Sequence, residues 1–272
     1  MKKKIHVINL RGEREPFSFK KVYQSARNVG ASKEVALKIA KEIEKEVFEG
    51  ISTSQIFERI FEILFKETPQ SAIKFNLKRS LEKLGPTGFP FEKFVARIFE
   101  VEGFEVKMNQ IIPGFCVSYE IDFLAKKGNF IYIAECKFRQ EAGGKVDLQS
   151  ALANYARFLD IQKRKFFNTK MQYKSILITN AKFTKEAIKY SECVGVELLG
   201  WKYPPGGGLE RLIEKNNFYP ITILPSVNRQ IAKELISQNI VLAKDVLEKK
   251  FEKIKVPNKD KILKEAKILF EK

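Results

Sequence analysis

Apolar residues in the first third of the chain recur with the spacing of amphipathic helices. A short alternating stretch from Ile5 to Leu10 and the turn residues after it predict a small hairpin. Helical periods then cover residues 22–28, 33–48, 54–66 and 70–84. Because Gly85-Pro86 ends the last period, the pattern predicts a mainly helical N-terminal domain over residues 1–86.

From Thr87 onward the pattern changes to helices interleaved with strands. Apolar positions from Phe91 to Phe99 form one face of a predicted helix. Strand-like runs follow at 105–108, 119–125, 130–138, 175–179 and 196–199, and helical periods at about 146–165 and 184–193. This alternation is typical of an α/β fold, which we assign to residues 87–205.

A break rich in proline and glycine, residues 204–208, follows the α/β segment. Beyond about Phe218, three apolar stripes at helical spacing predict a small helical C-terminal domain, which we assign to residues 206–272. No apolar run in the chain is long enough to cross a membrane.

The balance of charged residues is strongly basic. Fifty Lys and Arg against 33 Asp and Glu give a formal net charge of +17, which attracts polyanions such as nucleic acid. A Lys-rich surface of a thermophilic protein is an equally good explanation of the same excess. Charge alone therefore does not decide between the two.

Cysteine usage indicates a reducing environment. Cys116, Cys136 and Cys193 are far apart and form no C-x-x-C pair, so nothing in their spacing points to a zinc knuckle or a disulfide framework. The first ten residues are too short and too interrupted by polar positions to form a signal peptide. We therefore expect a soluble cytoplasmic protein.

The predicted strand 130–138 carries two charged residues among apolar ones. Glu135 and Lys137 are two positions apart, so they project from one face while Cys136 points the other way. Burying unpaired charges is costly, so the pair marks either a functional site or a buried ion pair at a sheet edge. The E-x-K spacing alone carries little information, because it recurs at three other places in the chain.

The preceding strand adds a second carboxylate. If the hairpin turns about Lys127-Gly128, position 122 faces position 133, and Asp122 is a diagonal neighbour of Glu135. Two such carboxylates suit Mg²⁺, which prefers oxygen ligands. Phosphodiester hydrolysis needs a cation of this kind and a fixed positive group near the attacking water, a role that Lys137 can fill.

An ordered set of short motifs resembles the Mrr-like restriction endonucleases of the PD-(D/E)XK superfamily. The set consists of Phe91–Val95, Gly103–Val106, Glu120-Ile121-Asp122, Ala134–Lys137, 176–180, 183–187 and 195–199. The resemblance covers about Phe89 to Trp201. It implies a restriction-endonuclease-like α/β core with a mixed sheet and a DNA endonuclease activity that depends on Mg²⁺ or Mn²⁺.

The resemblance also implies roles for individual residues. Asp122 and Glu135 are the expected metal ligands, with the backbone carbonyl of Cys136 as a third. Lys137 is expected to position or activate the attacking water.

Three further polar residues belong to the implied site. Glu92 on the predicted helix corresponds to a carboxylate that helps hold the metal or its waters, although a charge in a first helical turn is also favoured by the helix dipole. Glu120 shares the face of Asp122 and could assist it. Gln149 corresponds to a polar active-site position, and a solvated helix position is an equally good interpretation.

The segment after Lys137 is rich in basic residues. Residues 137–174 contain nine Lys or Arg and three acidic residues, which would form a basic stripe beside the metal site and follow a phosphate backbone. Phe166 and Phe167 lie within this segment and could stack on bases, or belong to the core.

The N-terminal segment, about Ile5 to Leu84, resembles the ATP-cone of ribonucleotide reductases and their repressor. The resemblance rests on residues 7–17, Lys21 and residues 50–56, and it implies a site for an adenine nucleotide, ATP or dATP. The implied site residues are Arg11, Arg14, Glu15, Lys21 and Thr53. Asn9-Leu10 replaces the family's usual Lys-Arg pair, so the alternative is a domain that keeps the fold and binds nothing.

Residues 224–247 look like a degenerate helix-hairpin-helix, a motif that grips phosphate through backbone N–H groups. A packing or dimerisation module is the alternative for this segment, and a homodimer stays open.

The whole chain allows three functions. The first is a Mg²⁺-dependent endonuclease gated by a nucleotide that is not hydrolysed, since no P-loop occurs. The second is a nucleotide-responsive DNA-binding regulator without nuclease activity, and the third is an exonuclease or junction resolvase on the same core.

Overall fold

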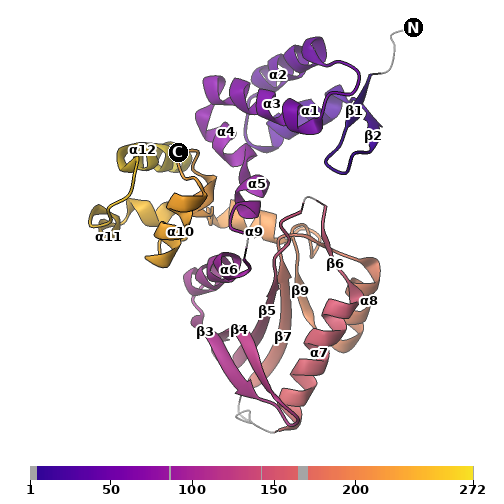
Figure 1. Ribbon diagram of the computed structural model, residues 1–272, viewed down its shortest axis with the longest axis vertical. Helices are drawn as coiled ribbons and strands as arrows, with labels where there is room; N and C mark the ends of the chain where they lie inside the picture. The colour runs from indigo at the N-terminus through magenta and orange to yellow at the C-terminus, as the bar shows by residue number, and fades with distance from the viewer. Residues whose placement is uncertain (1–4, 86, 142, 165–170, 272) are drawn as a thin grey trace.

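The computed structural model describes residues 5–85, 87–141, 143–164 and 171–271. It has three parts: a helical N-terminal domain, a central sheet covered by helices, and C-terminal helices packed at the junction of the other two (Figure 1). No helix among the described residues is long and apolar enough to span a membrane.

The N-terminal domain joins a two-stranded hairpin to four helices. Its elements are β1 (His6–Ile8), β2 (Arg14–Pro16), α1 (Phe19–Asn28), α2 (Lys33–Glu46), α3 (Thr53–Glu67) and α4 (Pro69–Phe75). Ser18, Ser32 and Ser52 each accept a hydrogen bond from a first-turn N–H group and so fix three helix starts. These elements enclose their own hydrophobic core, and the predicted hairpin and first three helices are confirmed.

The sequence pattern predicts one helix over residues 70–84, but the structure has two helices there. α4 ends at Phe75, and α5 (Leu77–Glu82) begins after Asn76, whose backbone leaves helical geometry. The prediction of one helix was wrong because the apolar spacing continues unchanged across the bend. Residues on both sides of it enter the same core: Ile73, Leu77, Leu81 and Leu84.

The central domain is built on a mixed five-stranded sheet, as expected. Its strands are β3 (Glu105–Pro113), β4 (Ser118–Lys127), β5 (Phe130–Lys137), β7 (Gln172–Thr179) and β9 (Glu197–Leu199), in the order β3-β4-β5-β7-β9. The first three are antiparallel, whereas β5, β7 and β9 run parallel. A short parallel pair, β6 (Lys145–Val146) and β8 (Lys182–Phe183), lies beside the sheet.

Helices cover both faces of the sheet (Figure 1). α6 (Phe89–Val101) packs Phe94 and Phe99 against one face, where they meet Phe123 of β4. α7 (Leu148–Lys163) covers the other face, where its Ile161 meets Ile133 of β5. α8 (Lys185–Val194) lies beside α7. Both faces of β5 are therefore buried, which explains its near-continuous apolar sequence.

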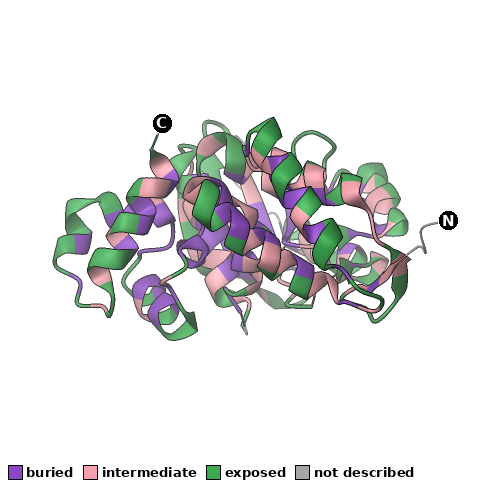
Figure 2. Cartoon of the chain, turned by 90° about the horizontal axis from the view of Figure 1, so that it is seen from above, coloured by how far each residue is buried: buried purple, intermediate pink, exposed green. Residues whose placement is uncertain are grey.

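The C-terminal segment returns to the middle of the molecule. Its elements are α9 (Leu209–Asn216), α10 (Arg229–Ser237), α11 (Lys249–Glu252), α12 (Lys259–Phe270) and the 3₁₀ turns η1 (Ile221–Ile223) and η2 (Ala243–Leu247). They share one continuous core with α4, α5, α6 and the sheet. Seen from above, buried residues run on from these helices into the centre of the molecule (Figure 2).

Two features of this segment differ from the sequence analysis. α9 was not expected, and the N–H groups of Leu209 and Glu210 bind the carbonyls of Gly200 and Trp201, so the helix is attached to the central domain. The helix-hairpin-helix resemblance implied free N–H groups near Ser226 for phosphate. Instead the Ser226 N–H donates to the buried carboxylate of Glu265 at 2.9 Å, and η2 replaces the expected second helix.

Candidate active site

The end of β5 places a buried carboxylate between two cations. Glu135 is only 6% exposed. The Nζ atom of Lys137 lies 2.6 Å from Glu135 Oε1, and the Arg157 guanidinium of α7 binds Oε2. Glu135 and Lys137 share a face as predicted, and Cys136 is buried on the opposite side against α6. The ion pairing offsets the cost of burying Glu135.

Asp122 lies directly across from Glu135. In the pairing of β4 with β5, Lys127 faces Phe130, so the hairpin turn is Gly128-Asn129. At the other end of the pairing Phe123 faces Ala134. The next position along each strand therefore sets Asp122 against Glu135. The expectation that position 122 faces position 133 was wrong, because the turn lies one residue later than assumed. Gly128 has a φ of 61°, which a two-residue hairpin turn requires and which glycine adopts without strain.

Backbone hydrogen bonding fixes the Asp122 carboxylate. Its Oδ2 atom accepts a hydrogen bond from the Cys136 N–H at 2.6 Å. Burial, and then the nearby Glu135 charge, raise the pKa of Asp122 to about 6. The negative charge on Asp122 is therefore disfavoured mainly because the carboxyl is withdrawn from water, and secondarily because Glu135 lies nearby.

Glu92 belongs to the same electrostatic cluster. It stands in the first turn of α6 and is partly buried, and its pKa is raised to about 7 by burial, Asp122, Glu135 and Glu120, in that order. A solvated first-turn charge would have no such environment. The structure thus brings together four of the five predicted catalytic residues, Glu92, Asp122, Glu135 and Lys137.

Gln149, the fifth predicted catalytic residue, does not join the other four. It is exposed in the first turn of α7, and it forms no hydrogen bond to Asp122, Glu135 or Lys137 in the described part of the chain. Glu120 is also exposed, beside the centre, and its effect on the pKa of Glu92 is electrostatic.

Arg157 is the site residue that the sequence analysis missed. It lies on the same face of α7 as the buried Asn154 and Ile161, three positions after one and four before the other. A cation on the buried face of a helix needs a buried partner, and Glu135 was the available one. That combination was the signal in the sequence, but it was hidden among the many basic residues of this segment.

The donor set fits a hard divalent cation. Among the described residues, no three His, Cys, Asp or Glu side chains gather closely enough to form a complete metal site by themselves. Mg²⁺ is commonly bound through one or two carboxylates and several waters, so the facing pair Asp122 and Glu135 is sufficient. The pKa of Asp122 is raised first by burial and then by the Glu135 charge, and a cation beside the carboxylate would offset both effects.

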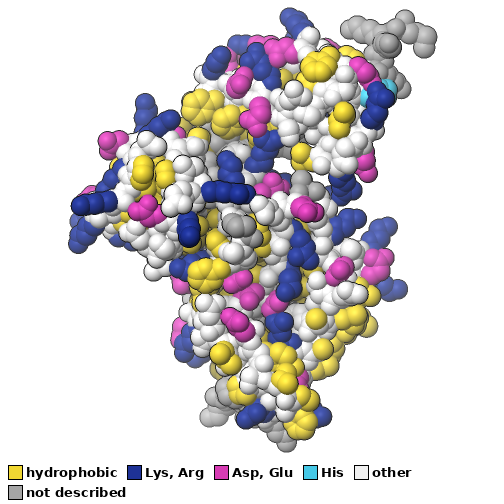
Figure 3. Space-filling model, in the orientation of Figure 1, with side chains coloured by type: hydrophobic (Ala, Val, Ile, Leu, Met, Phe, Trp, Pro, Cys, Tyr) yellow, Lys and Arg dark blue, Asp and Glu magenta, His cyan; other side chains and the backbone are white. Residues whose placement is uncertain are grey.

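Basic side chains gather on one face of the molecule. Figure 3 shows Lys and Arg side chains in a line over the sheet and at the junction of the three parts. At the far end of the sheet, Lys163 of α7 lies 4.1 Å from the ring centroid of the exposed Phe115. Phe166 and Phe167, which were considered for base stacking, lie outside the described residues.

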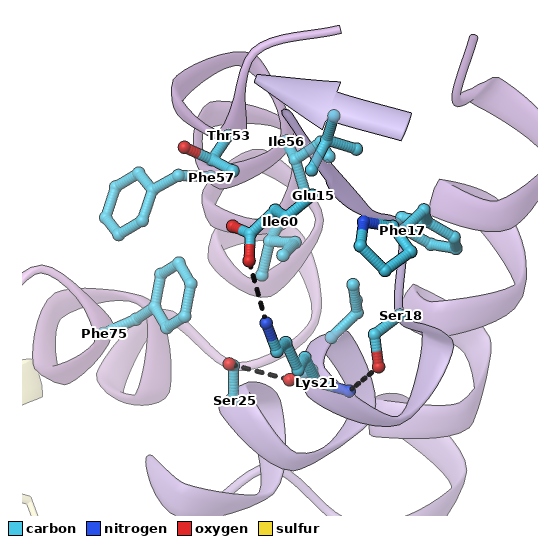
Figure 4. A pocket seen from close by; sticks show the side chains of 13 residues that line it. Glu15, Phe17, Ser18, Lys21, Ser25, Thr53, Ile56, Phe57, Ile60 and Phe75 are labelled. Atoms are coloured by element: carbon cyan, nitrogen blue, oxygen red, sulfur yellow. Dashed lines mark hydrogen bonds and ion pairs between the residues drawn. The ribbon is translucent and has the colours of Figure 1, made fainter. Parts of the chain in front are cut away.

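The N-terminal domain contains a second candidate site. A cavity of about 200 Å³ between the hairpin, α1 and α3 is lined by Glu15, Lys21 and Thr53. The Lys21 Nζ atom donates to Glu15 Oε2 at 3.1 Å, and Phe57 and Phe75 lie on one side of the cavity (Figure 4). Three of the five residues predicted for a nucleotide therefore meet in one place.

The two arginines of that prediction lie elsewhere. Arg14 forms an ion pair with Glu49, outside the cavity. Arg11, at the tip of the hairpin, donates to the backbone carbonyl of Gly143 at 3.1 Å, in the loop that follows β5. The hairpin of the N-terminal domain thus touches the segment that leaves the candidate active site.

Comparison with known proteins agrees with this architecture. Residues 85–201 match the family described as "Restriction endonuclease", and residues 219–270 match "AF1548-like, C-terminal". An uncharacterized protein of Archaeoglobus fulgidus is 40% identical over 161 residues, which is 59% of this chain and 88% of that protein. The crystal structure of AF1548, a protein of unknown function, is 35% identical over 67% of this chain and 98% of that chain, with a TM-score of 0.57.

The chain belongs to the AF1548-like family, and its central domain is of the restriction-endonuclease type. A repair endonuclease from Pyrococcus abyssi is 26% identical over 38% of this chain and 39% of that chain, but its TM-score of 0.28 is too low to support an argument. The N-terminal domain lies outside both matched family regions.

Proposed function

We propose that this protein is a metal-dependent DNA endonuclease whose centre is Asp122, Glu135 and Lys137. The observation that carries the proposal is the buried Glu135 at the end of β5, with Lys137 on one oxygen and Asp122 across from it. A regulator that only binds DNA has no need of a buried, mutually repelling carboxylate pair, which costs stability.

Each side chain has a defined part in the proposed reaction. A bound Mg²⁺ or Mn²⁺ supplies polarisation of the phosphate and a more acidic water. Asp122 and Glu135 would hold that ion, and the Cys136 N–H keeps the Asp122 carboxylate aimed at it. Lys137 orients the attacking water, while Arg157 keeps Glu135 in place from α7.

Cleavage of supercoiled plasmid with Mg²⁺ tests the proposal. Glu135→Ala or Asp122→Ala is expected to abolish cleavage while DNA binding persists, because the basic surface and not the carboxylates holds the backbone. Lys137→Ala is expected to lose cleavage but to bind Mg²⁺ as wild type does, which a titration with Mg²⁺ measures. Unchanged cleavage in both carboxylate variants would refute the assignment.

A matched control is available on β3. Glu105 and Lys107 have the same E-x-K spacing and form an exposed ion pair at 3.6 Å, away from the centre. Glu105→Ala and Lys107→Ala should leave cleavage unchanged. Linear, nicked and four-way-junction substrates in parallel distinguish an endonuclease from an exonuclease or junction resolvase.

DNA is the proposed partner because of the +17 net charge and the basic residues that gather on one face of the molecule. The logarithm of the binding constant on duplex DNA should fall with the logarithm of salt concentration, by roughly 0.9 for each phosphate neutralised. A flat salt dependence would count against nucleic acid as the partner.

We also propose that the N-terminal cavity takes an adenine nucleotide, ATP or dATP, as an effector. The Lys21–Glu15 pair beside Thr53 supports this, since Lys21 can exchange Glu15 for a phosphate. The hydrogen bond from Arg11 to Gly143 gives the domain a direct route to the loop after Lys137. A nucleotide can change cleavage only if it binds more tightly to one of two conformations that differ at the contact between Arg11 and Gly143.

Calorimetry with ATP tests the effector site. Lys21→Ala should weaken nucleotide binding and remove any effect of ATP on cleavage, while metal-dependent cleavage without ATP is retained. The neighbouring Lys20 is exposed and lines no part of the cavity, so Lys20→Ala is the control. Absence of binding at millimolar ATP would show that the domain has lost its ligand, with Asn9-Leu10 as the sequence mark of that loss.

A further inference from the structure

A larger cavity lies where α5, α6 and α10 meet. Its volume is about 430 Å³, and its walls are mainly apolar, with Leu84, Phe89, Pro90 and Ile236 among them. Phe89 is 42% exposed in the first turn of α6, so its ring is accessible to a ligand. The volume is within the range of sites that hold small organic groups.

The charges around this cavity all have one sign. Four cationic side chains line it, Lys83, Lys93, Arg229 and Lys233, and its described lining includes no carboxylate. In the described part of the chain none of the four forms an ion pair, although ion pairs are common elsewhere in this protein. Lys93 Nζ lies 5.3 Å from the Phe89 ring centroid and 3.4 Å from the Ile236 carbonyl.

The chain segment that lines the cavity also contacts residues beside the proposed active centre. A Cβ atom on Gly85, which lines the cavity, would lie 2.7 Å from the ring of Phe138, the residue after Lys137. A Cβ atom on Gly88 would lie 2.9 Å from the Glu92 carboxylate. Gly85 therefore contacts the residue after Lys137, and Gly88 contacts the side chain of Glu92.

We infer that this cavity accepts one unstacked nucleobase of the substrate next to the scissile phosphate. The inference rests on the proposed nuclease function. An apolar chamber with an aromatic ring suits the face of a base, and a cationic rim without carboxylates suits the flanking phosphates. The preferred substrate is then DNA with an unpaired nucleotide, because a base that is already free need not be extruded from a duplex.

The same features exclude the obvious competitors for the cavity. An apolar helix from another protein would leave four cations desolvated at its edge. A second copy of this chain would bring further positive charge, since each copy carries +17. A polyanion with an aromatic group satisfies both the walls and the rim.

Binding in EDTA tests the inference without requiring cleavage. The wild-type chain and Phe89→Ala are compared by fluorescence anisotropy on a paired duplex, on the same duplex with one unpaired nucleotide, and on one with an abasic unpaired position. Wild type should prefer the unpaired nucleotide by about 5- to 150-fold, the range that one stacked base contributes. Phe89→Ala should lose that preference and bind paired duplex as before.

The abasic substrate supplies the decisive comparison. Removal of the base should weaken binding to wild type as much as Phe89→Ala does, and the two changes together should add nothing further. Phe48→Ala, at a ring of similar exposure in the N-terminal domain, should keep the full preference. Additive effects, or an equal preference in wild type and Phe89→Ala, would overturn the inference.

A charge reversal guards against misfolding of the Phe89 variant. Lys233 is exposed on α10, so Lys233→Glu should fold, and it should weaken binding of the unpaired substrate more than that of the paired duplex. Equal weakening on both substrates counts against the site. Unchanged cleavage by Glu135→Ala and Asp122→Ala would refute the proposed nuclease function, but it would not alter these binding results. The failure of the proposed function and the failure of this inference are therefore distinguishable.

Discussion

Glu135 depends on two cations that come from different elements, Lys137 on its own strand and Arg157 on α7. Arg157→Ala leaves the buried carboxylate with one partner. Removing one member of a buried ion pair costs about 3–5 kcal/mol, and because Lys137 remains we expect a loss of about 3 kcal/mol in the free energy of unfolding.

Urea denaturation measures this loss in EDTA and in Mg²⁺. If Glu135 is a metal ligand, Mg²⁺ should restore part of the stability of Arg157→Ala, because the ion takes over the missing positive charge. Cleavage should also fall. An unfolding free energy equal to wild type would show that Arg157 is not a partner of Glu135 in solution.

Replacement of Asp122 is expected to have the opposite effect on stability, because its ionised carboxyl is unfavourable in the folded protein. Its pKa is raised to about 6 from an ordinary value near 3.8, so folding takes up a proton between these values and stability falls as pH rises from about 4 to about 6. Asp122→Asn removes this penalty. In EDTA at pH near 7.5 the variant should be about 1–2 kcal/mol more stable than wild type, after allowing for solvent access to the carboxyl.

The gain from Asp122→Asn should vanish as pH falls to about 4, where wild-type Asp122 is protonated in both states. Thermal unfolding at the two pH values, each in EDTA, measures it. Mg²⁺ should stabilise wild type alone. A variant less stable than wild type at pH 7.5 would mean that the carboxylate is favourable in the metal-free centre.

Single residues of the centre were predictable where strand alternation alone placed them. Glu135 and Lys137 stood out because charges on an apolar strand are costly, and Cys136 could be assigned to the other face. Arg157 required knowledge of which α7 face packs on the sheet. Gln149 was proposed from resemblance only, and the first turn of α7 leaves it exposed.

At the level of whole elements, strands and long helices were predictable, and their exact boundaries and connections were not. The β4–β5 turn lies one residue later than assumed, because a turn at Lys127-Gly128 and one at Gly128-Asn129 leave the same apolar alternation. α9 was missed because it is only eight residues long, so Leu209, Leu212 and Ile213 give a single helical repeat directly after the glycine-rich break.

The start of α6 is the element on which the centre and the cavity both rely. Gly85 lies against the Phe138 ring, where a Cβ atom would approach to 2.7 Å. Gly85→Ala is therefore expected to cost about 1–3 kcal/mol of stability by overpacking and to reduce cleavage by displacing Glu92 or Lys137.

Gly207→Ala is the control for that substitution. Its nearest neighbour would be 3.4 Å away, and Gly207 does not have a positive φ. Thermal unfolding and plasmid cleavage of both variants provide the measurement. Equal stability of Gly85→Ala and wild type would show that α6 can move without affecting the sheet.

Across the whole molecule, the C-terminal helices are bound to the helical segment before the nuclease domain. Thr222 Oγ1 is buried and donates to the Ser80 carbonyl at 2.7 Å, and Gln70 donates to the carbonyls of Leu269 and Glu271. Thr222→Val leaves the Ser80 carbonyl unsatisfied and should lower the free energy of unfolding by about 1–3 kcal/mol.

Denaturation in urea measures this effect, with Thr87→Val as the control because Thr87 is exposed. The loss should appear in the transition of the nuclease domain, whose core includes η1, and not in that of the N-terminal domain, whose core is separate. A lowered N-terminal transition would mean that the two cores unfold together.

The division between the two cores also bears on the order in which the chain folds during synthesis. The first core draws on residues 7–72, so this domain can fold as soon as that stretch has left the ribosome. The second begins at Ile73 and includes Leu269, near the far end of the described chain. The last helices complete the core that α6 shares with the sheet, so this second core is finished only once they have been synthesised. A partly synthesised chain would therefore carry many of its basic residues while the second core is still incomplete.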